Sequence, residues 1–154
     1  MKPSSYLTHT IFIILVSFSL QKITFWKPPT LANYFLENEL NYSISSFGKV
    51  PYGHSIIGRV IVANPVDLCS EPTISWKNDD NAGSIILLAK RGDCPFVKKA
   101  LNAQKVGANF VMFIDNQVEN VAKVLPFKDP SFSDAITIPS ILLEKEAGEK
   151  IYDT

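Results

Sequence analysis

The chain has 154 residues, which is enough for one modest domain once any leader is removed. Its 15 basic and 15 acidic residues balance to a formal net charge of zero. This balance argues against a nucleic-acid-binding surface and against a strongly basic surface for membrane binding.

The first 21 residues have the features of a secretory signal peptide. Lys2 supplies a positive charge, and Ile11–Leu20 is an apolar run too short to span a bilayer comfortably. An uncleaved anchor is the alternative, because Ile23–Trp26 extends the apolar character beyond this run. No later stretch of the sequence is long and apolar enough to cross a membrane. We therefore expect the protein in the secretory pathway lumen (endoplasmic reticulum, Golgi or vacuole) or outside the cell.

Residues 22–40 are predicted to form a linker and an N-terminal strand region, followed by one domain over residues 41–154. Pro28-Pro29-Thr30 is typical of a linker. The residues after it have poor periodicity, and short strands are expected around Tyr34–Leu36 and Tyr42–Ile44.

Two further features fit a secreted chain. Asn41 begins the N-glycosylation sequon Asn41-Tyr42-Ser43 and would face solvent if the site is used, although such tripeptides also occur by chance. Cys69 and Cys94 are the two cysteines, and an even count in a secreted chain suggests one disulfide. The alternative is a pair of free thiols in a reducing compartment.

Four later segments are predicted to be strands because they are rich in apolar or β-branched residues. One of them, Ile85–Ala89, is apolar throughout and is expected to be buried on both faces. The last one contains Pro139, which places it at a sheet edge or a bulge. The four segments are Ser55–Ala63, Ile85–Ala89, Phe110–Ile114 and Ile136–Leu143.

Two helices are expected between and after these strands. Asp93 or Cys94 can cap the first one, Pro95 suits its first turn, and Gly107 is a natural stop. The second helix is predicted over Glu144–Tyr152. This order of elements predicts an α+β or β-sandwich-like domain. In the first helix, Phe96, Ala100 and Ala103 are expected to share the buried face, whereas Lys98, Lys99, Asn102 and Lys105 point away.

Two parts of the chain together resemble the protease-associated (PA) domain. The first runs from Lys90-Arg91-Gly92-Asp93-Cys94-Pro95-Phe96 through a helical segment to Gly107-Ala108, and the second is Thr137-Ile138-Pro139-Ser140. PA domains show the same order of apolar strand, Arg-Gly-x-Cys-x-Phe, helix, Gly-Ala and apolar strand. Three pieces look most like the luminal PA domain of vacuolar sorting receptors: Phe47-Gly48, Pro51-Tyr52-Gly53 and the same Thr137-Ile138-Pro139-Ser140.

The resemblance implies a small β-sandwich or open barrel with flanking short helices. It also implies a module that binds peptide segments of cargo or partner proteins, with the loop Arg91–Phe96 as the contact. The candidate binding residues are thus Arg91, Gly92, Asp93, Cys94, Pro95 and Phe96.

Physical chemistry supports this role for the loop. Arg91 offers a planar fork of donors for peptide carbonyls or a carboxylate, and Gly92 permits close backbone approach. A disulfide at Cys94 would lower the cost of ordering the loop on binding. The alternative is that Gly92 and Cys94 only build the corner between strand and helix.

The chain departs from the family pattern after its last helix. PA domains usually have a closing strand there, and its loss would leave a sheet edge unpaired. We therefore expect the final strand to be missing, either in a fragment of a longer receptor or enzyme or in a reduced secreted form. Further luminal modules, a membrane span and a cytoplasmic tail would follow in a sorting receptor.

We find no sequence pattern for catalysis, for a metal site or for a cofactor. His54 is the sole candidate base outside the leader and is more typical of a turn. The acidic residues Asp79-Asp80, Asp129 and Asp134 lack the spacing of a calcium loop and are interpreted as solvated. Trp76 is interpreted as a packing residue.

The sequence therefore predicts a non-enzymatic binding module that recognises peptides, alone or as part of a sorting receptor. Two alternatives share the same domain. One is an accessory domain of a secreted or membrane peptidase, and the other is the luminal domain of a transmembrane RING ubiquitin ligase.

Overall fold

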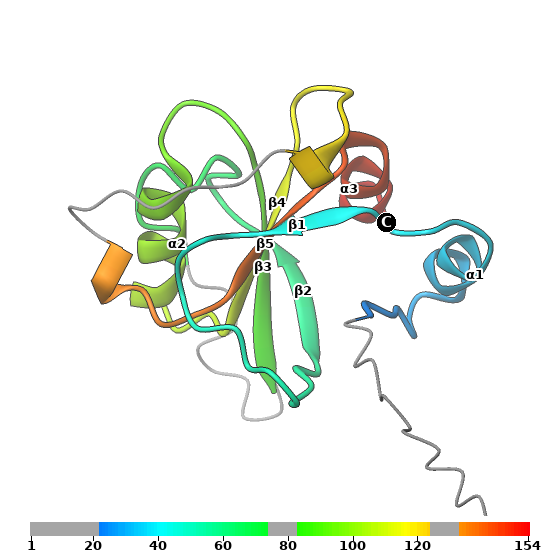
Figure 1. The fold of residues 1–154 in the computed structure, drawn as a ribbon, viewed down its shortest axis with the longest axis horizontal. Coiled ribbons are helices and arrows are strands. Elements are labelled where there is room, and N and C mark those ends of the chain that lie inside the picture. The colour runs from blue at the N-terminus through cyan, green and yellow to red at the C-terminus, as the bar shows by residue number, and fades with distance from the viewer. Residues whose placement is uncertain (1–21, 74–82, 124–132) are drawn as a thin grey trace, which may run out of the picture.

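A computed structural model describes residues 22–73, 83–123 and 133–154 (Figure 1). The leader, the loop that contains Trp76 and Asp79-Asp80, and the segment around Asp129 lie outside the described residues. Among the described residues, no helix has both the length and the apolar character that crossing a membrane requires.

The described strands form one five-stranded sheet in the order β1-β5-β4-β3-β2. The four strands from β2 to β5 run parallel to one another, and β1 pairs antiparallel with β5. The sheet is open, with β1 and β2 at its edges. The strands are β1 (Tyr42–Ile44), β2 (Gly58–Val62), β3 (Ser84–Lys90), β4 (Phe110–Ile114) and β5 (Ser140–Leu143).

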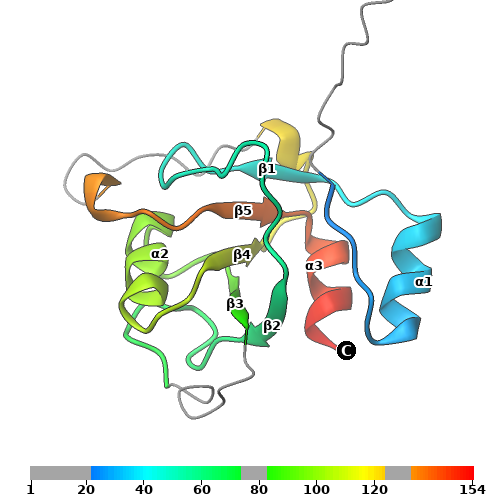
Figure 2. The ribbon, with the colours of Figure 1, turned by 90° about the horizontal axis from the view of Figure 1, so that it is seen from below.

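Helices cover both faces of this sheet (Figures 1 and 2). Helix α2 (Phe96–Lys105) lies on one face, and α3 (Lys145–Tyr152) lies on the other, with α1 (Pro29–Glu37) beside it. Two 3₁₀ turns, Val121–Lys123 and Ser133–Ala135, belong to the loop after β4. The predicted α+β class with flanking short helices is therefore confirmed.

Each face has its own hydrophobic core, and alternate residues of the central strands enter one or the other. Leu87 and Phe113 pack in the core under α2, whereas Ile86, Leu88 and Met112 pack in the core under α3. Because both faces are covered, β3 and β4 are apolar throughout, as expected for parallel strands. The prediction that Ile85–Ala89 is buried on both faces is confirmed.

Two local predictions are wrong. The residues around Tyr34–Leu36 lie in helix α1, where Pro29 begins the first turn and Leu31 and Phe35, one turn apart, pack in the core under α3. The strand with Pro139 is neither an edge strand nor bulged there, because β5 begins after this proline and lies between β1 and β4. The missing N–H of Pro139 thus falls outside the ladder.

Candidate functional site

The candidate site lies where two neighbouring parallel strands end. Arg91 directly follows β3, and the segment from Asp115 to Gln117 directly follows β4. The backbone N–H of Arg91 donates to the carbonyl of Ile114 at 2.9 Å, so the two strand ends stay joined. Ligands of open parallel sheets bind outside the carboxyl ends of the strands, which is the position of this site.

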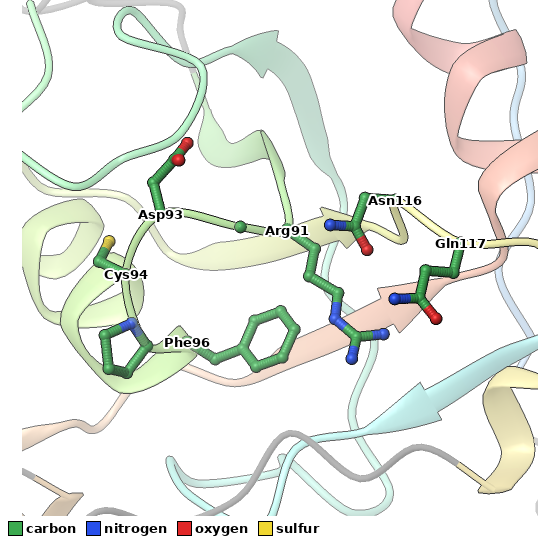
Figure 3. Close-up of a pocket in the computed structure, with 8 residues that line it drawn as sticks. Arg91, Asp93, Cys94, Phe96, Asn116 and Gln117 are labelled. Carbon is green, nitrogen blue, oxygen red and sulfur yellow. The ribbon is translucent and has the colours of Figure 1, made fainter.

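The side chains here surround an open hollow of about 470 Å³ (Figure 3). The guanidinium of Arg91 points between the ring of Phe96 and the amide of Gln117. The lining residues are Arg91, Gly92, Asp93, Cys94, Pro95, Phe96, Asn116 and Gln117.

Arg91 is held by two carboxylates from the loop after β4. Its Nη1 lies 2.8 Å from Oδ1 of Asp115 and 2.7 Å from Oε1 of Glu119. Burial by itself would lower the pKa of Arg91, but the hydrogen bonds and charges of Glu119 and Asp115 together outweigh it and raise the pKa. Both contacts use Nη1; among the described residues, neither Nε nor Nη2 donates to a protein group.

Asp115 is the buried partner of Arg91. Its side chain is buried, and Oδ1 also accepts the backbone N–H of Gln117 at 3.2 Å. Its other oxygen, Oδ2, is buried without a hydrogen-bond partner in the described part of the chain. Because a buried charge is costly unless it is paired, Asp115 depends on Arg91 as much as Arg91 depends on Asp115.

The backbone makes a sharp corner between β3 and α2. Gly92 has a φ of +121° and Asp93 a φ of +61°. Glycine adopts the first value without strain, and aspartate is among the residues that tolerate the second. The N-cap of α2 is Pro95, with no side-chain capping bond, so the prediction of Asp93 or Cys94 as the cap is wrong. The helical backbone begins only after Pro95, so Asp93 and Cys94 lie outside the helix. Pro95 itself has no side-chain oxygen that could accept from the first N–H groups of α2.

A disulfide joins this corner to the loop after β2. Cys69 and Cys94 are bonded, with their Cα atoms 5.7 Å apart. The described part of the chain contains no free cysteine. The corner that carries Gly92 and Asp93 is therefore fixed at its far end by a covalent bond.

Two polar residues of α2 hold the same loop through its carbonyls. Lys99 donates to the carbonyl of Asp67, and its Nζ lies 3.6 Å from Sγ of Cys69. Asn102 donates to the carbonyl of Leu68 at 2.9 Å. Both side chains are buried, so the prediction that they point away from the core is wrong. The loop after β2 covers this face of α2, and its position is not visible in the helical periodicity.

Burial lowers the pKa of Lys99. The nearby carboxylates of Asp67 and Asp93 act in the opposite direction and do not overcome this effect. Lys99 is thus a buried cation beside the disulfide, and it is satisfied by a backbone carbonyl.

Phe96 forms the apolar wall of the hollow. Its ring is half-buried and lies 4.9 Å from the ring of Phe113, measured between centroids. Cζ of Arg91 lies 6.0 Å from the centroid of Phe96, at the outer limit of a cation–π contact. A flat apolar surface and a guanidinium fork therefore stand side by side.

The structure places all six predicted residues, Arg91 to Phe96, around one hollow. Sequence reasoning missed Asn116 and Gln117 in the lining, and Asp115 and Glu119 as partners of Arg91. The missed signal was available, because polar residues that follow two adjacent buried strands meet at one edge of a parallel sheet.

The other predicted residues lie away from the hollow. Asn41 is exposed, and its Nδ2 donates to Oε2 of Glu144 at 3.3 Å. His54 is exposed in a turn and lines no part of the hollow. Over the described ranges, no three or more His, Cys, Asp or Glu side chains gather as metal ligands would.

Comparison with known proteins identifies relatives of this chain. The family model of the PA domain matches residues 56–151. Vacuolar-sorting receptor 3 of Arabidopsis thaliana is 38% identical over 117 residues, which are 71% of this chain and 19% of the receptor. Vacuolar-sorting receptor 1 of Pisum sativum is 37% identical over 72% of this chain and 19% of its own length.

Other relatives carry a different name. Signal peptide peptidase-like 4 of Oryza sativa subsp. japonica is 36% identical over 60% of this chain and 15% of its own length. The chain spans about a fifth of the length of the curated receptors it matches. A zinc aminopeptidase of Bacillus subtilis is similar in structure at 19% identity and a TM-score of 0.42, over 80% of this chain and 33% of that one. A likeness of this size does not bear on function.

Proposed function

This chain belongs to the PA domain family, and on that basis we propose that it is a non-catalytic module that binds peptide segments of cargo or partner proteins. The binding surface in this proposal is the hollow between Arg91 and Gln117. The similarity to sorting receptors that the sequence suggested is confirmed. The role in cargo binding is our proposal.

One observation carries the proposal. Arg91 is held beside the hollow by Asp115 and Glu119 through Nη1, and its Nε and Nη2 donate to no described residue. A guanidinium that is already positioned loses little side-chain entropy when it donates to a ligand. The disulfide of Cys94 holds the adjoining corner in the same way.

The charges of the site restrict which ligand group Arg91 can contact. Arg91 already faces two carboxylates, so an arriving ligand carboxylate would compete with Asp115 and Glu119 and meet their repulsion. A backbone carbonyl accepts from Arg91 without that cost. We therefore expect Arg91 to contact peptide carbonyls, with an apolar side chain of the ligand against Phe96.

The side chains that line the hollow support the proposal that the module is not catalytic. Cys94 carries no thiol because it is in the disulfide, and the lining residues include no histidine, serine or threonine. The described lining residues thus offer no nucleophile with an adjacent base.

The compartment in the proposal is the lumen of the secretory pathway. Disulfides persist in oxidising compartments, and this chain carries one beside its candidate site. The sorting receptors and peptidase-like proteins that it resembles are consistent with that location.

The test begins with ligands selected from a random heptapeptide library on the full chain. We expect Arg91→Ala to weaken the binding of the selected peptides about tenfold or more, because the fork of donors is lost. Lys98→Ala is the matched control, since Lys98 is an exposed cation in the first turn of α2 that does not line the hollow. Unchanged affinity in Arg91→Ala, with a native circular dichroism spectrum, would contradict the proposal.

A second function is favoured by a separate observation. The similarity to signal peptide peptidase-like proteins makes an accessory domain of a membrane peptidase the alternative. Sequencing the complete transcript separates the two, because a peptidase requires a catalytic module outside this domain. A transcript that encodes further receptor modules would support the sorting role.

We also propose that Asn41 carries an N-linked glycan. Its side chain is exposed and bonds only to Glu144 among the described residues. Digestion with a peptide N-glycosidase should lower the mass of the secreted protein, and the Asn41→Gln variant should show no change. Equal masses of the digested and undigested protein would exclude the glycan.

A further inference from the structure

A buried cation lies against the disulfide. Nζ of Lys99 is 3.6 Å from Sγ of Cys69, and the side chain of Lys99 is fully buried. Its hydrogen-bond partner is the backbone carbonyl of Asp67, and no described carboxylate forms an ion pair with it. A buried charge is costly unless an opposite charge pairs with it. A negative charge on Cys69 would therefore stabilise Lys99, and Lys99 would stabilise that charge.

The carboxylates near Lys99 do not supply this pairing. Asp67 and Asp93 act to raise the pKa of Lys99, yet burial outweighs both and the pKa is lowered. Oδ1 of Asp67 accepts the backbone N–H of Cys69 at 2.8 Å instead. Asp93 is exposed to solvent, which screens its charge. Among the described charged side chains, Lys99 is thus the one in contact with Sγ of Cys69.

The two sulfur atoms of the disulfide have different surroundings. Besides Nζ of Lys99, the carbonyl oxygens of Asp67 and Gly92 lie 3.7 and 4.0 Å from Sγ of Cys69. No polar group of the described residues makes such a contact with Sγ of Cys94. Cys94 lines the open hollow at Arg91 (Figure 3), whereas Cys69 does not. An anionic reagent that enters the hollow from solvent therefore meets Cys94, and the two carbonyl oxygens disfavour its approach to Cys69.

We propose that this disulfide undergoes thiol–disulfide exchange in one direction, in which a small-molecule thiol bonds to Cys94 and Cys69 is released. The thiolate sulfur of the reagent forms a bond to Sγ of Cys94 as the bond between Cys94 and Cys69 breaks. The electron pair of the broken bond stays on Sγ of Cys69, which leaves as a thiolate beside the ammonium of Lys99. The products are a mixed disulfide at Cys94 and a free thiolate at Cys69.

Lys99 favours this direction because it stabilises the leaving group. Exchange is faster when the departing thiolate has a lower pKa, and a nearby lysine lowers the pKa of a thiol. Lys99 is also able to pass a proton to Sγ of Cys69, since burial lowers its own pKa. A second reagent thiolate that attacks the mixed disulfide at the reagent sulfur then releases Cys94. Overall, the protein gains two thiols and the reagent is oxidised to its own disulfide.

The opposite direction, with the reagent bonded to Cys69, has one feature in its favour. Cys94 directly precedes the first turn of α2, and a helix N-terminus stabilises a thiolate. This direction requires the reagent anion to pass the carbonyl oxygens beside Cys69. It also leaves a neutral mixed disulfide beside the buried ammonium of Lys99, which then gains no counter-charge. Release of Cys69 satisfies both access and charge.

The consequence for peptide binding rests on the function proposed above. A mixed disulfide at Cys94 places the reagent beside the hollow and frees the corner from the loop after β2. We therefore expect the modified chain to bind the selected heptapeptides with about tenfold or more lower affinity. The exchange itself requires no peptide, so its site and rate are measurable whether or not peptides bind at Arg91.

The first experiment locates the reagent on the wild-type chain. The folded chain is incubated with glutathione, quenched with excess N-ethylmaleimide in urea and digested with trypsin. Cleavage after Arg91 and Lys98 releases Cys94 in a peptide of its own, which mass spectrometry identifies. We expect glutathione about tenfold more often on Cys94 than on Cys69, with the maleimide on the other cysteine. Glutathione mainly on Cys69, or equally on both, would overturn the proposal. So would a bond that stays closed in the folded chain at a glutathione concentration that opens it in urea.

The second experiment tests the role of Lys99 through the rate at which glutathione opens the bond. We expect Lys99→Met to slow this step about fivefold or more, because the leaving thiolate loses its cation. Lys98→Met is the matched control, since Lys98 is exposed on the same helix and should leave the rate unchanged. A purely structural role of Lys99 gives the opposite sign, because a loosened loop exposes the disulfide and speeds its reduction. A rate in Lys99→Met that equals or exceeds the wild-type rate would therefore overturn the proposal. The position of glutathione on the wild-type chain decides the matter if this variant does not fold.

Discussion

The two faces of the sheet are covered to different degrees. On the α2 face, a disulfide and the buried side chains of Lys99 and Asn102 fix the loop after β2 against the helix. Gln104 adds bonds to the carbonyl of Ala135 and the N–H of Thr137. On the α3 face, an eight-residue helix leaves a cleft of about 1020 Å³ open beside it.

This difference shows how a small domain can combine a fixed site with an open surface. The hollow at Arg91 begins at the corner that the disulfide anchors, so its donors are held in place. The cleft leaves apolar side chains of the sheet, such as Val60 and Met112, accessible beside α3. A contiguous apolar patch that is exposed at the surface is often an interaction site.

The largest effect is expected from truncation in the closed core. Leu87→Ala should destabilise the protein by about 4 kcal/mol, because Leu87 is fully buried under α2 and leaves a sealed cavity. Ile86→Ala, its neighbour facing the cleft, should cost about half as much, since the lost volume joins existing open space. Urea denaturation measures both free energies of unfolding. Equal costs would contradict the contrast between the two faces.

Removal of the disulfide should have the next largest effect. The double variant Cys69→Ser/Cys94→Ser should lose about 3.5 kcal/mol, because a loop of about 25 residues is no longer closed in the unfolded chain. The double variant should also bind peptides at Arg91 with lower affinity, because the corner beside Arg91 is no longer held by the disulfide. Chemical denaturation gives the first quantity and anisotropy the second. Loss of stability without loss of peptide affinity would show that the hollow does not need this anchor.

The contact of α3 with the sheet gives a smaller effect. A Cβ at Gly148 would lie 2.5 Å from Cγ2 of Ile114, so the helix packs closely on β4 through this residue. Gly148→Ala should therefore destabilise the fold by about 1–3 kcal/mol through overpacking. Glu149→Ala, which is exposed on the same helix, is the control in a thermal melt. A more stable Gly148→Ala variant would show that α3 is loosely packed.

The smallest effect is a pH dependence from Lys99. The pKa of Lys99 is lowered in the folded protein. Between this lowered pKa and the unfolded value of about 10.4, the unfolded chain therefore binds more protons than the folded chain. The contribution of Lys99 to the free energy of unfolding therefore increases with pH between these two pKa values, by at most about 1.4 kcal/mol per pH unit. Lys99→Met should remove the increase, as seen in urea denaturation across the alkaline range. A wild-type and a variant curve that stay parallel would exclude a lowered pKa.

The sequence predicted the parts of the molecule that depend on local pattern. Continuous apolar runs identified β3 and β4, and Pro95 with Gly107 bounded α2 to within two residues. Asp115 was missed as a site residue because its partner, Arg91, is distant in sequence and close only through strand pairing. The same holds for Lys99, whose burial depends on where the loop after β2 lies.

The most direct test of peptide binding at Arg91 is a ¹⁵N–¹H correlation spectrum recorded during titration with a selected heptapeptide. We predict that the largest shifts fall on the backbone amides of Arg91 to Cys94 and of Phe96, and on those of Asn116 and Gln117. We also predict that amides of β2 remain unchanged. Shifts confined to β2 and α3, or none at saturating peptide, would contradict the assignment of the hollow as the binding site.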